Sequence, residues 1–463
     1  MKLKNWEKID EWIAIHEAQL LEDIKMQVEI PSVSIVGIEP HIYGDECAKA
    51  ADCMMKLADD YGFDTENCAY RCVKISYGSG EKDIQIWNHL DVVPAGDGWE
   101  YPPYKCTRRD DFLIGRGVSD NKGAALAVLY SMRYLKDQEI KLNYHLSQIC
   151  GFSEENGMDD AAYYLSKYTP PDFAFVSDCP FPLCYGEKGR CVFNLINDLV
   201  PEEILDMIAG VVSNSIPDTA TFTFEGQITV QNSDLSILEL DENKTIITAK
   251  GRAGHAAAPE RCLNPIGVLG NALKNAKQLN ADTRRCMEFL GLVCADGYGT
   301  GFGIDDCDSV FGRLSCAGTV IRILDGKINV TFDLRYPPSA DLKVLLDKVS
   351  TISAEYGFRL ANTVHKDGYS RNMDSMYIQT LIETYETIMK DGKKSYVMGG
   401  NTYAGIIPNA VGFGPGIPKD YSNLGLPKGH GGGHGCDEVQ SISGLEEAIK
   451  IYILALLALN ECF

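Results

Sequence analysis

The feature of this sequence that most constrains its fold is that several candidate metal ligands stand where apolar segments end. His89 follows D-I-Q-I-W-N, Glu154 and Glu155 follow an apolar segment over 141–150, and Asp178 follows F-A-F-V-S. Short apolar runs bounded by Gly, Pro or Asn are typical of buried strands. Open α/β sheets place their functional sites at the carboxyl ends of parallel strands. The sequence therefore predicts an α/β fold, with a mostly parallel sheet flanked by helices and a site at one edge of it.

Amphipathic segments around these strands are expected to form the flanking helices. The predicted helices cover 5–27, 46–62, 121–136, 375–390 and 442–460, and the predicted strands cover 69–77, 84–88, 141–150 and 173–177. Gly62 is expected to end the second helix in a left-handed conformation. Alternating strands and helices indicate a largely parallel sheet with helices on both faces.

A second domain is expected because the character of the chain changes after about residue 186. Strands are predicted over 190–196, 220–227, 245–251, 318–324 and 327–334, and helices over 201–212, 264–277 and 341–356, with an irregular segment over 285–308. The pattern of the first domain returns from about Ser375. We therefore expect a catalytic domain formed by 1–185 and 375–463, split by an inserted α+β lid domain over 186–374.

Composition excludes several classes of partner. The net charge of −22 argues against nucleic acid and against an anionic membrane surface. The first residues lack the apolar segment and cleavage site of a signal peptide, and no run approaches the ~18 apolar residues of a membrane span. The 16 cysteines occur without a C-x-x-C pair, which favours buried thiols over a zinc ribbon. We expect a soluble cytoplasmic protein with no membrane or nucleic-acid partner.

Four motifs carry the candidate chemistry: N-H-L-D-V-V-P (88–94), G-R-G-V-S-D-N-K-G (115–123), S-E-E-N-G (153–157) and H-G-C-D-E (434–438). With F-V-S-D-C-P they supply His89, Asp91, Asp120, Glu154, Glu155, Asp178 and His434. Such a set of carboxylates and imidazoles suits two divalent metals and the hydrolysis of amide bonds. Asp120 is a candidate bridging ligand, since each of its oxygens can serve one metal, and Asp91 is a candidate for orienting His89.

Each motif also has a simpler explanation when it is taken alone. His89 and Asp91 fit a solvated turn, and Asp120 fits the N-cap of the following helix. Glu154 and Glu155 fit a pair of surface residues. His430 stands among glycines and is assigned no role, while Cys436 beside His434 leaves a nucleophile pair open, although adjacency in sequence is not geometry.

Taken together, the motifs resemble the M20 metallopeptidases, and the PepV-type dipeptidases in particular. Further matching segments are Y-G-E-K-G (185–189), V-S-N-S-I-P-D-T-A (212–220), A-G-H-A-A-A-P (253–259), D-L-R-Y-P (333–337) and G-G-N-T-Y-A (399–404). The resemblance covers nearly the whole chain in the same order. It implies a zinc-exopeptidase type of fold with the lid domain inserted.

The resemblance also implies the ligands of two zinc ions. One ion would be bound by His89, Asp120 and Asp178, and the other by Asp120, Glu155 and His434. Asp120 would bridge the two, and the Asp120–Asn121 peptide bond would be cis. Carboxylate-rich sites of this kind also accept manganese or cobalt.

Further residues receive catalytic and substrate roles from the resemblance. Glu154 would be the general base, and His255 of the lid would donate to the developing oxyanion. Asn214 and Arg335 would hold the polar ends of the substrate. Without the resemblance, His255 would be read as a loop histidine and Arg335 as a surface arginine.

The implied function is that of a zinc dipeptidase acting on short unblocked peptides. An N-acyl amino acid deacylase would use the same metal chemistry, and a non-catalytic metal- or peptide-binding protein is the third alternative. A monomer is expected, because the long insertion can enclose the substrate by itself. Gly405 stands where an Arg usually follows T-Y-A in this branch, which leaves open how the terminal carboxylate of the substrate is held.

Overall fold

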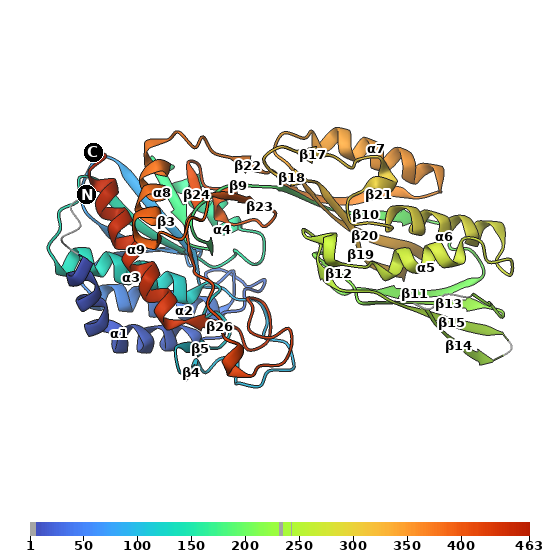
Figure 1. The fold of residues 1–463 in the computed structure, drawn as a ribbon, viewed down its shortest axis with the longest axis horizontal. Coiled ribbons are helices and arrows are strands. Elements are labelled where there is room, and N and C mark those ends of the chain that lie inside the picture. The colour runs from blue at the N-terminus through green and yellow to red at the C-terminus, as the bar shows by residue number, and fades with distance from the viewer. Residues whose placement is uncertain (1–5, 231–234, 242) are drawn as a thin grey trace. The chain divides into compact units, whose positions relative to one another are not determined.

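The computed structural model describes residues 6–230, 235–241 and 243–463, so Asn5 of the helix expected over 5–27 lies outside the described residues. The chain folds as two compact units (Figure 1). The first unit comprises Met1–Gly186, Arg371–Tyr396 and Thr402–Phe463, and the second comprises Glu187–Ser370 and Val397–Asn401. Residues 397–401, which the sequence interpretation assigns to the catalytic domain, pack with the second unit because Asn401 Nδ2 donates to the Lys188 carbonyl at 2.9 Å.

The sheet of the first unit has parallel strands at its centre and antiparallel strands at its edges. Its strands run in the order β1 (Asp64–Cys68), β2 (Cys72–Tyr77), β6 (His145–Gly151), β3 (Asp83–His89), β7 (Phe173–Val176), β24 (Ala410–Gly412) and β9 (Cys184–Glu187). The pairs β6–β3, β3–β7 and β7–β24 are parallel. The pairs β1–β2, β2–β6 and β24–β9 are antiparallel. The predicted α/β fold is confirmed, with its parallel part limited to β6, β3, β7 and β24, of which the first three lead to candidate ligands.

Helices cover this sheet and bury its apolar side chains. They are α1 (Trp6–Val28), α2 (Asp45–Asp60), α3 (Lys122–Asp137), α4 (Asp159–Lys167), α8 (Met376–Met389) and α9 (Ile442–Asn460). Helix α3 is buried over almost its whole length, where it packs against α1 and α9. Gly62, with φ of 75°, follows α2 in the predicted left-handed conformation. Within the described residues, we find no helix with the length and apolar composition needed to span a membrane.

A small three-stranded sheet explains how distant motifs meet. It consists of β4 (Thr107–Arg109), β5 (Phe112–Ile114) and β26 (Val439–Ser441), in the order β26–β5–β4. The antiparallel pairing of β26 with β5 places the segment after β5, which leads to Asp120, beside the segment before β26, which carries His434. Two further short strands, β8 (Cys179–Pro180) and β25 (Pro415–Gly416), pair in parallel just after Asp178. The strands β22 (Tyr369–Ser370) and β23 (Tyr396–Met398) lie at sequence boundaries between the units.

The second unit is an antiparallel sheet with helices packed on one face. The strands run in the order β14 (Leu235–Asp241), β15 (Lys244–Lys250), β13 (Thr219–Glu225), β11 (Ile204–Ala209), β19 (Ser315–Leu324), β20 (Lys327–Tyr336), β10 (Gly189–Asn197) and β21 (Arg359–Lys366). Helices α5 (Pro265–Leu273), α6 (Ala281–Val293) and α7 (Leu342–Glu355) share one apolar core with these strands (Figure 1). Two short pairs, β12 (Ser215–Ile216) with β16 (Gly254–His255) and β17 (Cys307–Asp308) with β18 (Gly312–Arg313), complete the unit. The predicted α+β character of the insertion is confirmed.

Two local predictions were wrong. The helix expected over 201–212 is instead strand β11, which is hydrogen-bonded to both β13 and β19. Burial alternates along it, with Met207 fully buried and Ile208 46% exposed, as a strand requires. Pro and Glu before an apolar segment resembled a helix N-terminus, but pairing in the sheet outweighed that local preference. The segment 285–308 is also less irregular than expected, since α6 occupies its first part.

Candidate active site

The first unit gathers the predicted metal ligands at the carboxyl ends of its parallel strands. His89 is the last residue of β3, Glu154 and Glu155 follow β6, and Asp178 follows β7. Because β3 lies between β6 and β7, the three strand ends are neighbours. Possible metal-ligand atoms form two groups, and within each group all of them lie within 4.8 Å of one another. The first group comes from His89, Glu154 and Asp178, and the second from His89, Asp120 and Glu155. The structure therefore brings together residues that the sequence separates widely.

Asp120 lies between the two histidines. Its Oδ1 is 3.0 Å from His89 Nε2, and its Oδ2 is 3.1 Å from His434 Nε2. Each oxygen of one carboxylate thus faces a different imidazole, which is the arrangement expected of a ligand that bridges two metals. The Asp120–Asn121 peptide bond is cis, as the resemblance implies. The Asn121 amide donates to Asp178 Oδ1 at 2.9 Å and so fixes another of the predicted ligands.

The remaining distances test whether these residues fit divalent metals. His434 Nε2 lies 2.8 Å from Glu155 Oε1, and His89 Nε2 lies 3.7 Å from Asp178 Oδ2. Neighbouring ligand atoms of a tetrahedral zinc ion, with bonds of about 2.0–2.1 Å, stand roughly 3.3 Å apart. The measured separations lie on both sides of that value. The donor atoms, imidazole nitrogens and carboxylate oxygens, are those that zinc, manganese and cobalt accept, so the residues fit two such ions.

The electrostatics of the cluster indicate an excess of negative charge. Burial and the charge of Asp120 raise the pKa of Asp178 to about 8. Burial also raises the pKa of Glu154 well above its usual range, and the charges of Asp178 and Glu155 add to the effect. Hydrogen bonds to Asp120 and Glu155 raise the pKa of His434 to about 11. Carboxylates this crowded are stabilised when a cation lies among them.

Asp91 is placed to orient His89. Its carbonyl oxygen lies 3.0 Å from His89 Nδ1, and its Oδ1 lies 3.4 Å from the same nitrogen. Since a carbonyl only accepts, Nδ1 carries the proton and Nε2 is left to face Asp120. The carboxylate of Asp91 also accepts the backbone N–H groups of Glu154 at 3.3 Å and Glu155 at 3.1 Å. Through its backbone carbonyl and its buried carboxylate, Asp91 therefore organises two of the four motifs.

A buried ion pair that sequence reasoning missed joins the other two motifs. Glu438 accepts the backbone N–H groups of Gly117 at 3.1 Å, Ser119 at 2.8 Å and Asp120 at 2.9 Å. Arg116 Nη1 donates to the same carboxylate at 2.7 Å. Arg116 Nη2 donates to the carbonyl of His434 at 3.2 Å. Both residues stand inside quoted motifs, but no sequence pattern distinguishes them from solvated charges.

The loop that carries His434 is held by further contacts. His434 itself has a positive φ of 63°, so its backbone is in the left-handed region. Asp437, which is fully buried, accepts the backbone N–H groups of Glu100 and Tyr101 and lies 2.5 Å from His430 Nδ1. His430, assigned no role from the sequence, thus stabilises this loop. The Cys436 thiol, for which the sequence leaves a nucleophile pair with His434 open, donates to the Asp97 carbonyl at 3.1 Å.

A second missed pair, Asp160 and Tyr403, fixes the turn before Glu154. Asp160 Oδ2 accepts the backbone N–H groups of Phe152 at 2.7 Å and Ser153 at 2.9 Å, and the Tyr403 hydroxyl at 2.5 Å. Both side chains are fully buried. They lie so close to Gly151 that a Cβ atom there would collide with them. Tyr403 belongs to the T-Y-A segment, whose Gly405 ends a short 3-10 helix over Tyr403–Gly405.

The three residues expected to serve the substrate all belong to the second unit. His255 is exposed on β16, and its Nδ1 accepts the backbone N–H of Ala257 at 3.1 Å, which leaves the ring proton on Nε2. The carbonyl of Asn214 accepts the backbone N–H of Ala256 at 2.9 Å. Arg335 is buried, and its Nε donates to Asp333 Oδ1 at 2.6 Å. His255 and Asn214 are thus neighbours, while Arg335 is occupied by another side chain.

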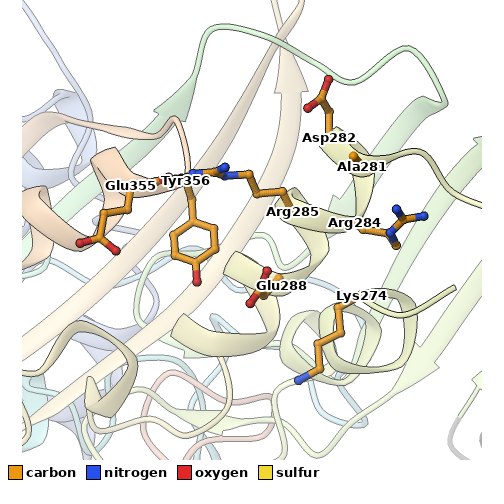
Figure 2. Close-up of a pocket in the computed structure, with 8 residues that line it drawn as sticks. All are labelled: Lys274, Ala281, Asp282, Arg284, Arg285, Glu288, Glu355 and Tyr356. Carbon is orange, nitrogen blue, oxygen red and sulfur yellow. Dashed lines mark hydrogen bonds between the residues drawn. The ribbon is translucent and has the colours of Figure 1, made fainter.

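A separate cavity on the second unit is not part of this chemistry. It has a volume of about 480 Å³ and lies beside α6 and the end of α7 (Figure 2). Charged side chains of both signs line it: Lys274, Asp282, Arg284, Arg285, Glu288 and Glu355. Arg285 donates to the carbonyl of Glu355 and Arg284 to that of Leu279, so both arginines satisfy backbone acceptors. None of the predicted site residues lines it.

The fold and the ligand cluster are those of a metal-dependent hydrolase, and comparison with known proteins identifies which kind. Residues 86–458 match peptidase family M20/M25/M40. The chain belongs to this family and is a metallopeptidase.

Individual relatives agree with this assignment. A protein of Staphylococcus haemolyticus named "Putative dipeptidase" is 26% identical over 433 residues, which cover 88% of this chain and 91% of the relative. Human carnosine dipeptidase 1 has a similar structure, with a TM-score of 0.59 and 16% identity over 99% of both chains. The di-peptidase Dug1p of Saccharomyces cerevisiae matches with a TM-score of 0.61 and 15% identity over 98% of both chains. At these identities the two structures demonstrate a shared fold.

Proposed function

We propose that this metallopeptidase is a dipeptidase of the PepV type that uses two divalent metal ions, with zinc preferred, to hydrolyse short unblocked peptides. The observation that carries the proposal is the position of Asp120, whose two oxygens face His89 at 3.0 Å and His434 at 3.1 Å. The dipeptidase name carried by the staphylococcal relative supports the substrate class.

The proposed ligands divide into two sets that share Asp120. His89, Asp120 and Asp178 would hold one ion, and Asp120, Glu155 and His434 the other. Ions bound there supply Lewis-acid polarisation of the scissile carbonyl and lower the pKa of a water molecule. Asp91 and Asn121 would orient the ligand side chains for them, because Asp91 contacts His89 and Asn121 donates to Asp178.

Glu154 is the proposed general base. It would take the proton of the attacking water and return it to the amine of the leaving amino acid. Desolvation at its partly buried position raises its pKa, which suits a group that must hold a proton for part of the cycle. A carboxylate oxygen of Glu154 also lies within 4.8 Å of possible metal-ligand atoms of His89 and Asp178, so Glu154 is itself a candidate ligand. A Glu154→Gln variant that retains both metals would therefore separate a base from a ligand.

The second unit is proposed to supply the groups that contact the substrate. His255 is the proposed donor of a hydrogen bond to the developing oxyanion, an interaction worth about 3 kcal/mol in other hydrolases. Asn214 and Arg335 are proposed to hold the polar ends of the substrate, as the resemblance implies. We further propose that a single chain is the active species, which sedimentation at assay concentration would test.

The proposal is tested by incubating the purified protein with a mixed pool of dipeptides, tripeptides and N-acetyl amino acids. Mass spectrometry then follows each substrate with and without chelator. The proposal predicts chelator-sensitive loss of dipeptides. Loss of the acetylated amino acids alone would instead establish a deacylase, and no turnover by protein that holds its metals would contradict both activities.

A further inference from the structure

Two cysteines lie opposite each other at the closed end of the hairpin formed by β1 and β2 in the first unit. The antiparallel register pairs Cys68 of β1 directly with Cys72 of β2, and both are free thiols. Directly opposed residues of antiparallel strands share a face of the sheet, with Cα atoms about 4.5 or 5.5 Å apart. A disulfide bond spans Cα separations of about 4.4–6.8 Å. The backbone therefore holds the two thiols where a bond can join them.

The turn between the strands fixes this arrangement. Ala69 and Tyr70 have positive φ angles of 57° and 52°, and the Arg71 N–H donates to the Cys68 carbonyl at 3.1 Å. Two consecutive left-handed residues closed by such a bond form a type I′ turn, whose twist matches that of hairpin strands. The turn therefore keeps the two cysteines opposed.

The surroundings make the two thiols chemically different. A hydrogen bond from the Cys72 thiol lowers the pKa of Cys68 below its ordinary value, against the opposing effect of burial. The Tyr168 hydroxyl and Lys74 also lower it, while the charge of Glu66 raises it. The same hydrogen bond and burial raise the pKa of Cys72 well above its ordinary value. Because the thiolate is the nucleophile, Cys68 is suited to attack an oxidant and Cys72 to react second.

The pair lies at an edge of the sheet, which restricts access without abolishing it. Strand β1 is the first strand in the order of the nine-stranded sheet, and the loop residue Ala69 is exposed. Cys68 is 3% exposed, while Cys72 is fully buried. Edge strands and the ends of hairpins open locally at a lower cost in free energy than central strands. A small oxidant therefore reaches Cys68 first.

Cys150 of the adjacent strand β6 is excluded as a partner by the pleat of the sheet. The register pairs Cys72 with Gly151 and Val73 with Cys150. Successive side chains of a strand point to opposite faces, so Cys72 and Cys150 lie on opposite faces. Burial also raises the pKa of Cys150, which keeps it protonated. Cys68 thus remains the thiol that Cys72 faces.

We propose that Cys68 and Cys72 form a redox modification site that hydrogen peroxide converts into a disulfide bond. The Cys68 thiolate attacks one peroxide oxygen, which breaks the O–O bond, forms the sulfenic acid of Cys68 and releases hydroxide. The hydroxide takes up the proton that Cys68 lost on ionisation. The Cys72 thiol then attacks the sulfenic sulfur, which forms the S–S bond and releases the sulfenic oxygen as water. The two cysteines lose two electrons, and one peroxide molecule becomes two molecules of water.

The test treats the full-length, metal-loaded protein with hydrogen peroxide. The remaining thiols are then alkylated in denaturant, and the cysteine peptides are mapped by mass spectrometry. Cys68 and Cys72 should be recovered joined to each other, and a dithiol reductant should restore both to the alkylatable form. Cys307→Ser is the matched control, since Cys307 is an exposed thiol whose partner in the register is Arg313, and it should form the same bond as the wild type.

Two variants test the separate roles of the cysteines. Cys72→Ser should stop at the sulfenic acid of Cys68, which dimedone traps. Cys68→Ser should react with peroxide at Cys72 at least about 10-fold more slowly than the wild type does at Cys68, because the thiol at Cys72 stays protonated. An undiminished reaction at Cys72 would overturn the proposed order of attack.

The peptide map of the wild-type protein decides the question even if neither variant folds. A wild-type protein in which Cys68 and Cys72 both remain fully alkylatable, at a peroxide dose that oxidises the exposed Cys307, would overturn the proposal. Oxidation of Cys68 to the sulfinic acid without a bond to Cys72 would overturn it as well. These measurements read the chemistry of the thiols directly, so they are independent of the proposed dipeptidase activity.

Discussion

Replacing Glu438 with Gln should disrupt the site although Glu438 is not a proposed ligand. Each of its oxygens accepts two hydrogen bonds, Oε1 from Ser119 and Asp120 and Oε2 from Gly117 and Arg116. An amide keeps one oxygen and turns an NH₂ group toward the donors of the other. Glu438→Gln therefore removes two bonds and leaves the buried Arg116 without a counter-charge.

The size of the effect follows from these contacts. Breaking a buried ion pair by removing one partner costs about 3–5 kcal/mol, because the remaining charge stays buried. For a unit of this size, such a loss should lower the thermal midpoint on the order of 10 °C. Because Glu438 holds the backbone of Asp120 and Arg116 holds the carbonyl of His434, we also expect bound metal to be lost.

Differential scanning calorimetry and elemental analysis of the desalted protein would measure both effects. Glu46→Gln is the matched control, since Glu46 is an exposed carboxylate that pairs with Lys49 at 2.6 Å. Exposed pairs of this kind contribute about 0–1 kcal/mol, so the control should resemble the wild-type protein. A Glu438→Gln variant that unfolds within about 2 °C of the wild type and keeps its metal would show that Glu438 does not hold the site together.

Three further variants test the proposed general base, the turn before it and a buried lysine. Glu154→Gln should lower kcat at least about 100-fold without loss of metal, as expected for a general base; metal loss in parallel with activity would assign it as a ligand instead. Tyr403→Phe removes the hydroxyl that donates to Asp160 and should lower the free energy of unfolding by about 1.5–3 kcal/mol. The variant should also have a lower kcat, with a smaller change in KM. An unchanged kcat would contradict the role of Tyr403 in positioning the turn before Glu154. Burial lowers the pKa of Lys122 to about 7 from 10.5, so between these pH values the unfolded chain binds more protons and stability rises with pH, by up to about 1.4 kcal/mol per pH unit. Lys122→Met should remove that rise, and unfolding measured at pH 7 and pH 9 would show whether it persists.

Much of the fold was predictable because its signals are local. Apolar strands that end at His89 and Asp178 predict a parallel sheet with its site at the strand ends, and the structure has that arrangement. The segment over 204–209 was misassigned because its strand conformation depends on partners that lie far away in the sequence. Local preference and pairing in the sheet conflict there, and the pairing determines the structure.

The supporting residues of the site were harder to predict than its candidate ligands. In the sequence, Glu438, Arg116 and Asp160 look like ordinary charged residues. Their roles depend on hydrogen bonds that form only in the folded chain. Arg335 shows the opposite case, since the resemblance implies a substrate contact while the structure shows it bonded to Asp333 and Gly399. Burial and hydrogen-bond partners of this kind are tertiary properties that no short motif encodes.

Two metals bridged by Asp120 are proposed to make this chain a dipeptidase. The most direct test is a titration of zinc into chelator-treated protein, in which bound metal per chain and dipeptide hydrolysis are measured on the same samples. Hydrolysis should be absent without metal and reach its maximum as the second equivalent binds, and Asp120→Asn should bind neither ion tightly. Full hydrolysis without metal, or with a single equivalent bound, would contradict it.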